Sequence, residues 1–319
     1  MKKIDYFKLL KDSAEFTWKY KVLWLFGFII TLFSGSGGGS TSNYNFSNDD
    51  ISESDFSNVS GRVQNLINTP YFWIILIAVI ILSLVFVAVS WYLRRVSDIA
   101  LLNSVRYDKG EQYPKITIKN LWKGSHPYLM KFLKFDLLYL LIIFPILIFL
   151  IILIVVPIIV YPSIGIFLIC CSLPIFMLVT LIFNILKQTI ERILFFSRLK
   201  IIDSIKEGFL VLKNNLGKYA LAYLTQLLPG CIFSIVKGFL SIIAVLPFIA
   251  IILAAVINPD IWWFSIGSIC CGTIVFWIVI AGIQAPYTVF VRTFWTRFII
   301  NLISDDAKIK NVEEAEIVN

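Results

Sequence analysis

The stretch YFWIILIAVIILSLVFVAVSWYL, residues 71–93, decides the class of this protein. It contains no charged residue, and roughly 20 consecutive apolar residues are enough for a helix to cross the hydrocarbon core of a bilayer. Trp73 and Trp91 lie near its two ends, where tryptophan is enriched in membrane helices. The stretch therefore predicts a membrane-spanning helix.

Apolar runs on both sides extend this prediction to the whole chain. They cover residues 16–33, 135–162, 164–186, 219–257 and 261–303. Of the 319 residues, 59% are hydrophobic and 15% are charged, whereas about one quarter of an average soluble domain is charged. We predict an all-α integral membrane protein, with residues 1–319 forming a single membrane domain of six transmembrane helices.

The first of these runs leads into FGFIITLFSGSGGGSTSN, residues 26–43, which has two interpretations. A cleaved signal peptide would have an apolar core of about 7–15 residues followed by a small-residue cleavage site such as A-x-A. Here a patterned segment precedes the core, no A-x-A site follows it, and the rest of the chain is hydrophobic. We favour a first span, with Lys19 and Lys21 reaching toward the headgroups, that leads into a flexible external loop over 34–69.

The basic residues are concentrated in alternate connections between the apolar runs. Segments 2–21, 94–134 and 187–218 are rich in lysine and arginine, whereas loop 34–69 carries several acidic residues and the single Arg62. The positive-inside rule then predicts that both termini are cytoplasmic. Contact with anionic lipid headgroups of the inner leaflet explains the net charge of +8, so we expect membrane lipids as partners and no nucleic acid.

A segment with helical apolar spacing precedes each odd-numbered span. In the third such segment the face consists of Ile202, Ile205, Phe209, Leu212 and Leu216. The same spacing gives Ile118, Leu121, Ser125, Tyr128 and Phe132 in the second segment, and Ile4, Phe7, Lys11, Ala14 and Trp18 in the first. We expect the face containing Ile202 and Phe209 to lie on the membrane surface. Within the second segment, Pro127 should kink or end the helix.

The register of these segments continues into the spans that follow, where Leu23, Leu137 and Leu221 correspond. This continuity predicts three repeated units, each an amphipathic helix plus a helical hairpin. The units are repeat 1 (1–110), repeat 2 (111–198) and repeat 3 (199–303), followed by a cytoplasmic tail (304–319).

The apolar run 219–257 has two interpretations: two short spans separated at Lys237, or one long element that contains Pro229. The six-span arrangement requires one long element, because this keeps the basic residues after 290 on the cytoplasmic side. The last external turn is then at 258–260.

Polar residues at membrane depth are the candidate site, because burying them is costly unless they pair or line a wet cavity. Asn184, Gln188 and Glu191 share one helical face. Residues in neighbouring spans that could join them are Asp136, Gln226 and Gln284. These residues could form a cytoplasm-facing polar cavity for a lipid headgroup or small solute. Alternatively, they could hydrogen-bond between helices and fix the packing of the spans, and we favour this second interpretation. Lys237 is a further candidate, although reaching to the external surface would also explain it.

The residues that enzymes use are sparse in this sequence. It has one histidine, His126, which lies in a basic segment, and five cysteines in apolar stretches without metal-ligand spacing. We find no nucleophile with a base, no metal cluster and no nucleotide-binding loop. We predict a protein without catalytic residues, cofactor or metal.

Three stretches together resemble a known group: FTWKYKVLWLFGFIITLFSGSGGGS (16–40), IIDSIKEGFLVLKNNLGKYALAYL (201–224) and APYTVFVRTFWTRFIINL (285–302). They are similar to bacterial multi-pass membrane proteins of uncharacterised function, related to the membrane region fused to some glycerophosphodiester phosphodiesterases. The resemblance implies a six-helix fold in a bacterial plasma membrane but not the phosphodiesterase reaction, which needs a separate domain.

Two functions are compatible with these features. The first is a membrane scaffold or regulatory subunit whose amphipathic helices lie on the inner leaflet and contact lipids, a partner protein or a second copy of the chain. The alternative is a lipid-handling protein or small-solute transporter that binds its ligand in the polar cavity.

Overall fold

The computed structural model describes residues 4–33, 70–108, 115–160, 162–197, 199–257 and 262–317, with side chains over most of these ranges. Every regular element in these ranges is a helix, which confirms the predicted all-α class. The helices are α1 (Tyr6–Lys19), α2 (Leu23–Phe33), α4 (Pro70–Tyr107), α5 (Ile118–Val160), α6 (Pro162–Phe196), α7 (Ile201–Asn214), α8 (Leu216–Ile257) and α9 (Trp262–Ile317). The predicted external loop 34–69 and the turn 258–260 lie outside the described residues.

Three described helical segments are long and apolar enough to cross a membrane: Tyr71–Tyr107, Leu216–Pro247 and Gly272–Ser304. The pair α1 and α2, bent by 101° at the break between them, would together make a fourth. The chain is therefore a helical protein with several candidate membrane spans. The sequence left two interpretations for 219–257, and the structure has one helix there, α8, of 42 residues.

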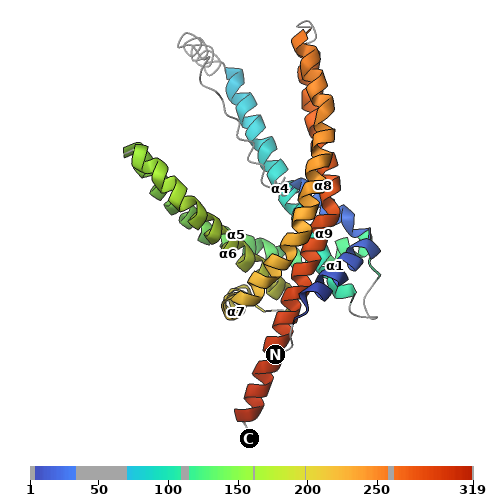
Figure 1. Ribbon diagram of the computed structural model, residues 1–319, viewed down its shortest axis with the longest axis vertical. Coiled ribbons are helices and arrows are strands. Elements are labelled where there is room, and N and C mark those ends of the chain that lie inside the picture. The colour runs from blue at the N-terminus through green and yellow to red at the C-terminus, as the bar shows by residue number, and fades with distance from the viewer. Residues whose placement is uncertain are drawn as a thin grey trace.

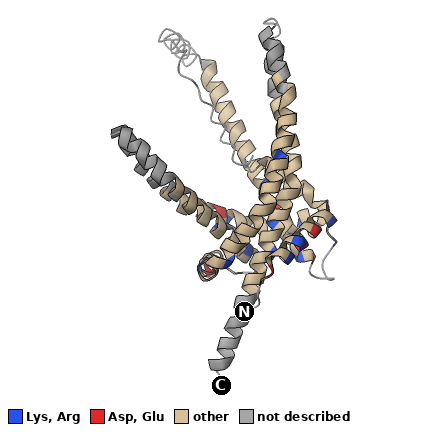
Figure 2. Cartoon of the chain, in the orientation of Figure 1, with Lys and Arg blue, Asp and Glu red and all other residues tan. Residues whose placement is uncertain are grey.

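The helices form a packed base from which three arms diverge (Figure 1). We define the arms as residues 70–94 of α4, the α5–α6 pair over 140–186, and the α8–α9 pair over 220–284. The base is the rest of the described chain up to residue 304, and α9 continues beyond it to Ile317 (Figure 1). Among the residues coloured in Figure 2, Lys, Arg, Asp and Glu lie mostly in the base, and the arms consist almost entirely of other residues.

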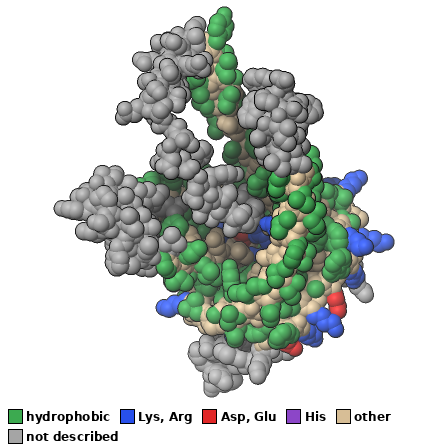
Figure 3. Space-filling model, turned by 45° about the horizontal axis from the view of Figure 1, so that its top comes forward, with side chains coloured by type: hydrophobic (Ala, Val, Ile, Leu, Met, Phe, Trp, Pro, Cys, Tyr) green, Lys and Arg blue, Asp and Glu red, His purple; other side chains and the backbone are tan. Residues whose placement is uncertain are grey.

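Nearly all of the hydrophobic core lies in the base, while the arms expose most of their apolar side chains. The most apolar windows of Tyr71–Tyr107 and Leu216–Pro247 are 0% buried, whereas burial along α4 begins at Arg95 and continues to Val105. Hydrophobic side chains cover much of the visible described surface (Figure 3). Soluble proteins rarely expose so much apolar surface unless it contacts a membrane or another protein. The length of the arms is suited to a bilayer.

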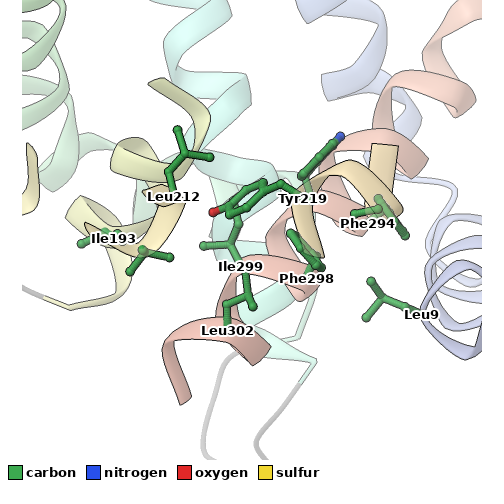
Figure 4. Packing of buried hydrophobic residues seen from close by; sticks show 11 residues of the cluster. Leu9, Ile193, Leu212, Tyr219, Phe294, Phe298, Ile299 and Leu302 are labelled. Atoms are coloured by element: carbon green, nitrogen blue, oxygen red, sulfur yellow. The ribbon is translucent and has the colours of Figure 1, made fainter. Parts of the chain in front are cut away.

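Helix α9 passes through the centre of the base and supplies much of its core. Phe294, Phe298 and Leu302 of α9 pack with Leu9 of α1 and Tyr219 of α8 (Figure 4). The Tyr219 and Phe298 rings meet edge to face at 5.2 Å between centroids, a favourable aromatic geometry. The base therefore joins segments from both ends of the chain.

Local sequence signals set several helix boundaries. Asp5 caps α1 by accepting a hydrogen bond from the Lys8 backbone nitrogen at 3.0 Å. Asn215 ends α7, and its side-chain Nδ2 donates to the Val211 carbonyl at 3.0 Å. Helix α5 continues through Pro127, so this proline does not end the helix. Leu121 and Phe132, on either side of this proline, are buried in the base and hold the helix in place.

Candidate functional site

A buried arginine, Arg95 of α4, is the centre of an ion-pair network in the base. Its Nε donates to Oδ2 of Asp136 on α5 at 2.6 Å, and its Nη2 also contacts the same carboxylate. Its Nη1 donates to Oε1 of Glu191 on α6 at 2.9 Å and lies 3.8 Å from Oδ2 of Asp98. The fork of one guanidinium thus joins three helices, a role that suits arginine because its donors have a fixed planar geometry.

The network extends from Asp98 to helix α9. Arg292 of α9 lies 3.3 Å from Oδ1 of Asp98. Arg192 is fully buried beside them, and it donates from Nε to Thr296 Oγ1 at 3.2 Å and from Nη1 to the Gln188 carbonyl at 2.7 Å. Helices α4, α5, α6 and α9 are therefore tied together by charged side chains beneath the point where the arms separate.

The positive charges of this cluster keep the Glu191 carboxylate ionised. Glu191 lies on α6 beyond the apolar run 164–186. Burial alone would raise the pKa of its carboxyl, but the positive charges of Arg95, Lys187 and Arg292 lower that pKa to about 2. Glu191 is a permanent anion at neutral pH, which suits an ion-pairing role rather than proton transfer.

A cavity of about 380 Å³ adjoins the network between α4, α5 and α6. Its polar end contains Arg94, Arg95, Asp136 and Lys187. Its apolar wall consists of Leu140, Ile143 and Phe144, and Trp91 and Tyr139 complete the lining. The cavity is thus charged where it meets the base and hydrophobic along the arm.

The structure brings together only some of the six polar residues singled out in the sequence. Asp136 and Glu191 meet at Arg95. Gln188 contributes its backbone carbonyl to Arg192, and Asn184 is exposed. The interhelical hydrogen-bonding interpretation fits the first pair, because both carboxylates are occupied by cations.

Gln226 and Gln284 lie elsewhere, in the α8–α9 pair. Gln226 Oε1 accepts a hydrogen bond from Trp295 Nε1 at 2.6 Å. Gln284 Oε1 accepts one from Lys237 Nζ at 3.0 Å. Lys237 is thus paired between the two helices, and Gln226 lines a separate open cavity of about 520 Å³ between them.

The predicted membrane-surface face is divided by the structure. Ile202, Phe209 and Leu216 are exposed, whereas Ile205 is partly buried and Leu212 belongs to the core. Ile202 and Phe209 therefore form an exposed apolar stripe on a side of α7 that does not face the core, and Leu216 is the first residue of α8. In the first segment, Phe7 and Trp18 are likewise exposed.

Sequence reasoning missed the basic members of the site, Arg94, Arg95 and Lys187, because all were assigned to the cytoplasmic charge pattern. A signal was present in SWYLRRVSD, residues 90–98, where an arginine pair ends an uncharged run and an aspartate follows Arg95 by one helical turn. Among the described side chains, no group of three or more His, Cys, Asp or Glu residues is placed to hold a metal ion.

Comparison with known proteins gives a family. No curated protein and no solved structure matches this chain. One family model matches residues 17–299, from the last turn of α1 through most of α9, and so includes every residue of the ion-pair network and of the cavity. The chain belongs to the family of unknown function DUF7544.

Proposed function

We propose that this protein is a non-enzymatic membrane scaffold or regulatory subunit of a bacterial plasma membrane. Most of its base would lie at the cytoplasmic surface, with both termini on that side. The five helices of the arms, together with the first span over 16–33, would anchor it in the bilayer as six spans. We also propose that the chain consists of the three repeated units, and that it is related to the membrane region fused to some glycerophosphodiester phosphodiesterases.

The location of the core carries the proposal. The packed interior is in the base, and the arms present unburied apolar faces. Arms of this kind are stable only when lipid or another protein covers them. A transporter needs helices packed around a path through the membrane, and the described parts of the arms diverge instead (Figure 1). A base held rigid by buried ion pairs is well suited to presenting a surface to partners.

The exposed apolar side chains of the amphipathic helices supply such a surface. Phe7 and Phe209 are 73% and 56% exposed, and Trp18 and Ile202 are exposed as well. Basic side chains accompany them, with Lys8 and Lys11 on α1 and Lys206 and Lys213 on α7. A helix with an apolar stripe and lysines binds an anionic leaflet or the apolar surface of a partner.

The test is photo-cross-linking in intact cells from a photoreactive phenylalanine at position 209. The matched control places the same residue at Asp203, an exposed charged position of α7. We expect one discrete protein adduct from 209 and none from 203. Three results together would contradict the scaffold function and support transport. No adduct would form from position 209, the purified protein would move solute or lipid across vesicle membranes, and Glu191→Gln would abolish that movement.

A further inference from the structure

We propose that the cavity between α4, α5 and α6 binds an anionic glycerophospholipid, with the phosphate of the headgroup against Arg94 and Lys187 and an acyl chain along α5. The inference takes the membrane setting from the proposed function, but it assigns a ligand that the scaffold role does not require.

The first support is a surplus of hydrogen-bond donors at the polar end of the cavity. Asp136 already accepts from Arg95 and from Trp91 Nε1 at 3.1 Å, and it lies 3.5 Å from Lys187 Nζ. Its carboxylate is therefore fully occupied. Arg94 lines the cavity, and its Nε is buried without a hydrogen-bond partner among the described residues, so it would meet a ligand oxygen once the side chain turns toward the cavity. A buried donor without a partner is costly, and an anionic oxygen is the acceptor that would satisfy it best.

The second support is the balance of charge. Five cations meet in and beside the cavity: Arg94, Arg95, Lys187, Arg192 and Arg292. Three carboxylates oppose them: Asp98, Asp136 and Glu191. This leaves two positive charges in excess in a region of low solvent exposure, where the attraction for an anion is stronger than in water. A phosphate diester carries one negative charge, and its oxygens suit the arginine fork.

The third support is the apolar wall, which decides for a lipid over a soluble phosphate. Leu140 and Phe144 are 63% and 58% exposed, and with Ile143 they follow one another along α5 away from the charged end. A ligand that fills the cavity must be charged at one end and hydrophobic at the other. Glycerophospholipids have this structure, and their phosphates lie at the depth where a span meets the membrane surface.

Lys187 occupies a position suited to respond to the ligand. Its Nζ lies 4.7 Å from the centre of the Tyr139 ring, and its side chain is 26% exposed. Unlike Arg95, it has only one carboxylate partner in the network and a flexible stem. We expect it to turn from Asp136 to the phosphate without breaking the ion pairs that hold the helices together.

The experiment uses native mass spectrometry of the full chain in a mild detergent. The probes are dioleoyl phosphatidylglycerol, dioleoyl phosphatidylcholine and glycerol 3-phosphate, each titrated separately and then in competition. We expect one phosphatidylglycerol molecule to bind with preference over phosphatidylcholine, and glycerol 3-phosphate not to displace it. Arg94→Gln and Lys187→Gln should each weaken binding by about tenfold, as loss of a charged hydrogen bond does.

The controls separate a specific site from general charge attraction. Lys206→Gln removes an exposed lysine of α7 and should leave phosphatidylglycerol binding unchanged. Arg94→Lys should retain part of the affinity for phosphatidylglycerol. Affinities are compared between variants whose unfolding midpoint equals that of the wild type. Equal weakening by Lys206→Gln, equal affinity for phosphatidylcholine, or displacement by glycerol 3-phosphate would each overturn the proposal. None of these outcomes bears on cross-linking at position 209, so the scaffold function is tested independently.

Discussion

Arg95 of α4 and Glu191 of α6 form a hydrogen-bonded ion pair of 2.9 Å whose side chains are only 6% and 8% exposed. The pair lies beneath the divergence of the arms and joins helices that are far apart in the sequence. Ion pairs of this kind are costly to break, because removal of one partner leaves the other charge buried and unpaired.

Arg95→Met should therefore destabilise the base by about 3–5 kcal/mol, because it leaves both Asp136 and Glu191 without their main cation. Glu191→Gln keeps a hydrogen-bond acceptor and should cost less. The midpoint of thermal unfolding in detergent measures both changes. Equal midpoints for wild type and Arg95→Met would show that the network contributes little to stability.

Gly27 sets the distance between α2 and α9. A Cβ atom at this position would clash with the Ala285 carbonyl oxygen and lie 2.8 Å from Val289 Cγ2. Gly27→Ala should destabilise the protein by about 1–3 kcal/mol through overpacking, although alanine favours helices. Gly282→Ala is the matched control, since a Cβ atom there meets nothing within 4 Å. A neutral or stabilising Gly27→Ala would contradict the close packing of α2 on α9.

Two large apolar residues of α7 should respond oppositely to truncation. Leu212→Ala removes a core side chain and should cost about 2–5 kcal/mol. Phe209→Ala removes an exposed side chain and should change the stability of the detergent-solubilised protein by less than about 0.5 kcal/mol. Only Phe209→Ala should weaken binding of the solubilised chain to a partner or to anionic vesicles. The unfolding midpoints of the two variants would be similar if the face of α7 were assigned incorrectly.

The Lys237–Gln284 contact should show direct coupling between α8 and α9. Gln284→Leu leaves the ammonium group of Lys237 without its 3.0 Å acceptor, whereas Lys237→Met with Gln284→Leu removes both polar groups. The double variant should be more stable than the sum of the two single changes predicts. A coupling of about 0.5–1.5 kcal/mol is typical of such pairs in membrane helices. Additive effects would mean that Lys237 finds another partner.

The predicted orientation is tested with single cysteines in a chain whose native cysteines are replaced by alanine. Lys123→Cys in the base should be protected from a membrane-impermeant maleimide in intact cells and labelled after lysis. Ser47→Cys, in the predicted external loop 34–69, should be labelled in intact cells. Labelling of both positions in intact cells would invalidate the predicted topology.

Several features of this protein could be read directly from local sequence. The apolar run 71–93 predicts a membrane helix, and α4 contains it. The helical spacing of residues 202–212 predicts a helix, and α7 occupies these residues. Both segments are helical as predicted, because hydrophobicity and helical period are properties of consecutive residues.

The candidate site was only partly accessible from the sequence. Asp136 and Glu191 were recognised because charges near membrane depth are unusual, but their common partner Arg95 was assigned to the surface charge pattern. Gln226 and Gln284 were grouped with them and instead pair with Trp295 and Lys237. Periodicity specifies which residues share a face of one helix, but not the neighbour that this face meets.

The sequence by itself determined that this chain is helical and has segments long and apolar enough to cross a membrane, because length and apolarity are properties of consecutive residues. Only the tertiary structure decided that the core lies in the base, that Leu212 is buried while Phe209 is exposed, and that Arg94 lies at a cavity with an apolar wall. These outcomes depend on the rotation and crossing of whole helices. They are set by packing between segments as distant as Leu9 and Phe298, which no local pattern encodes.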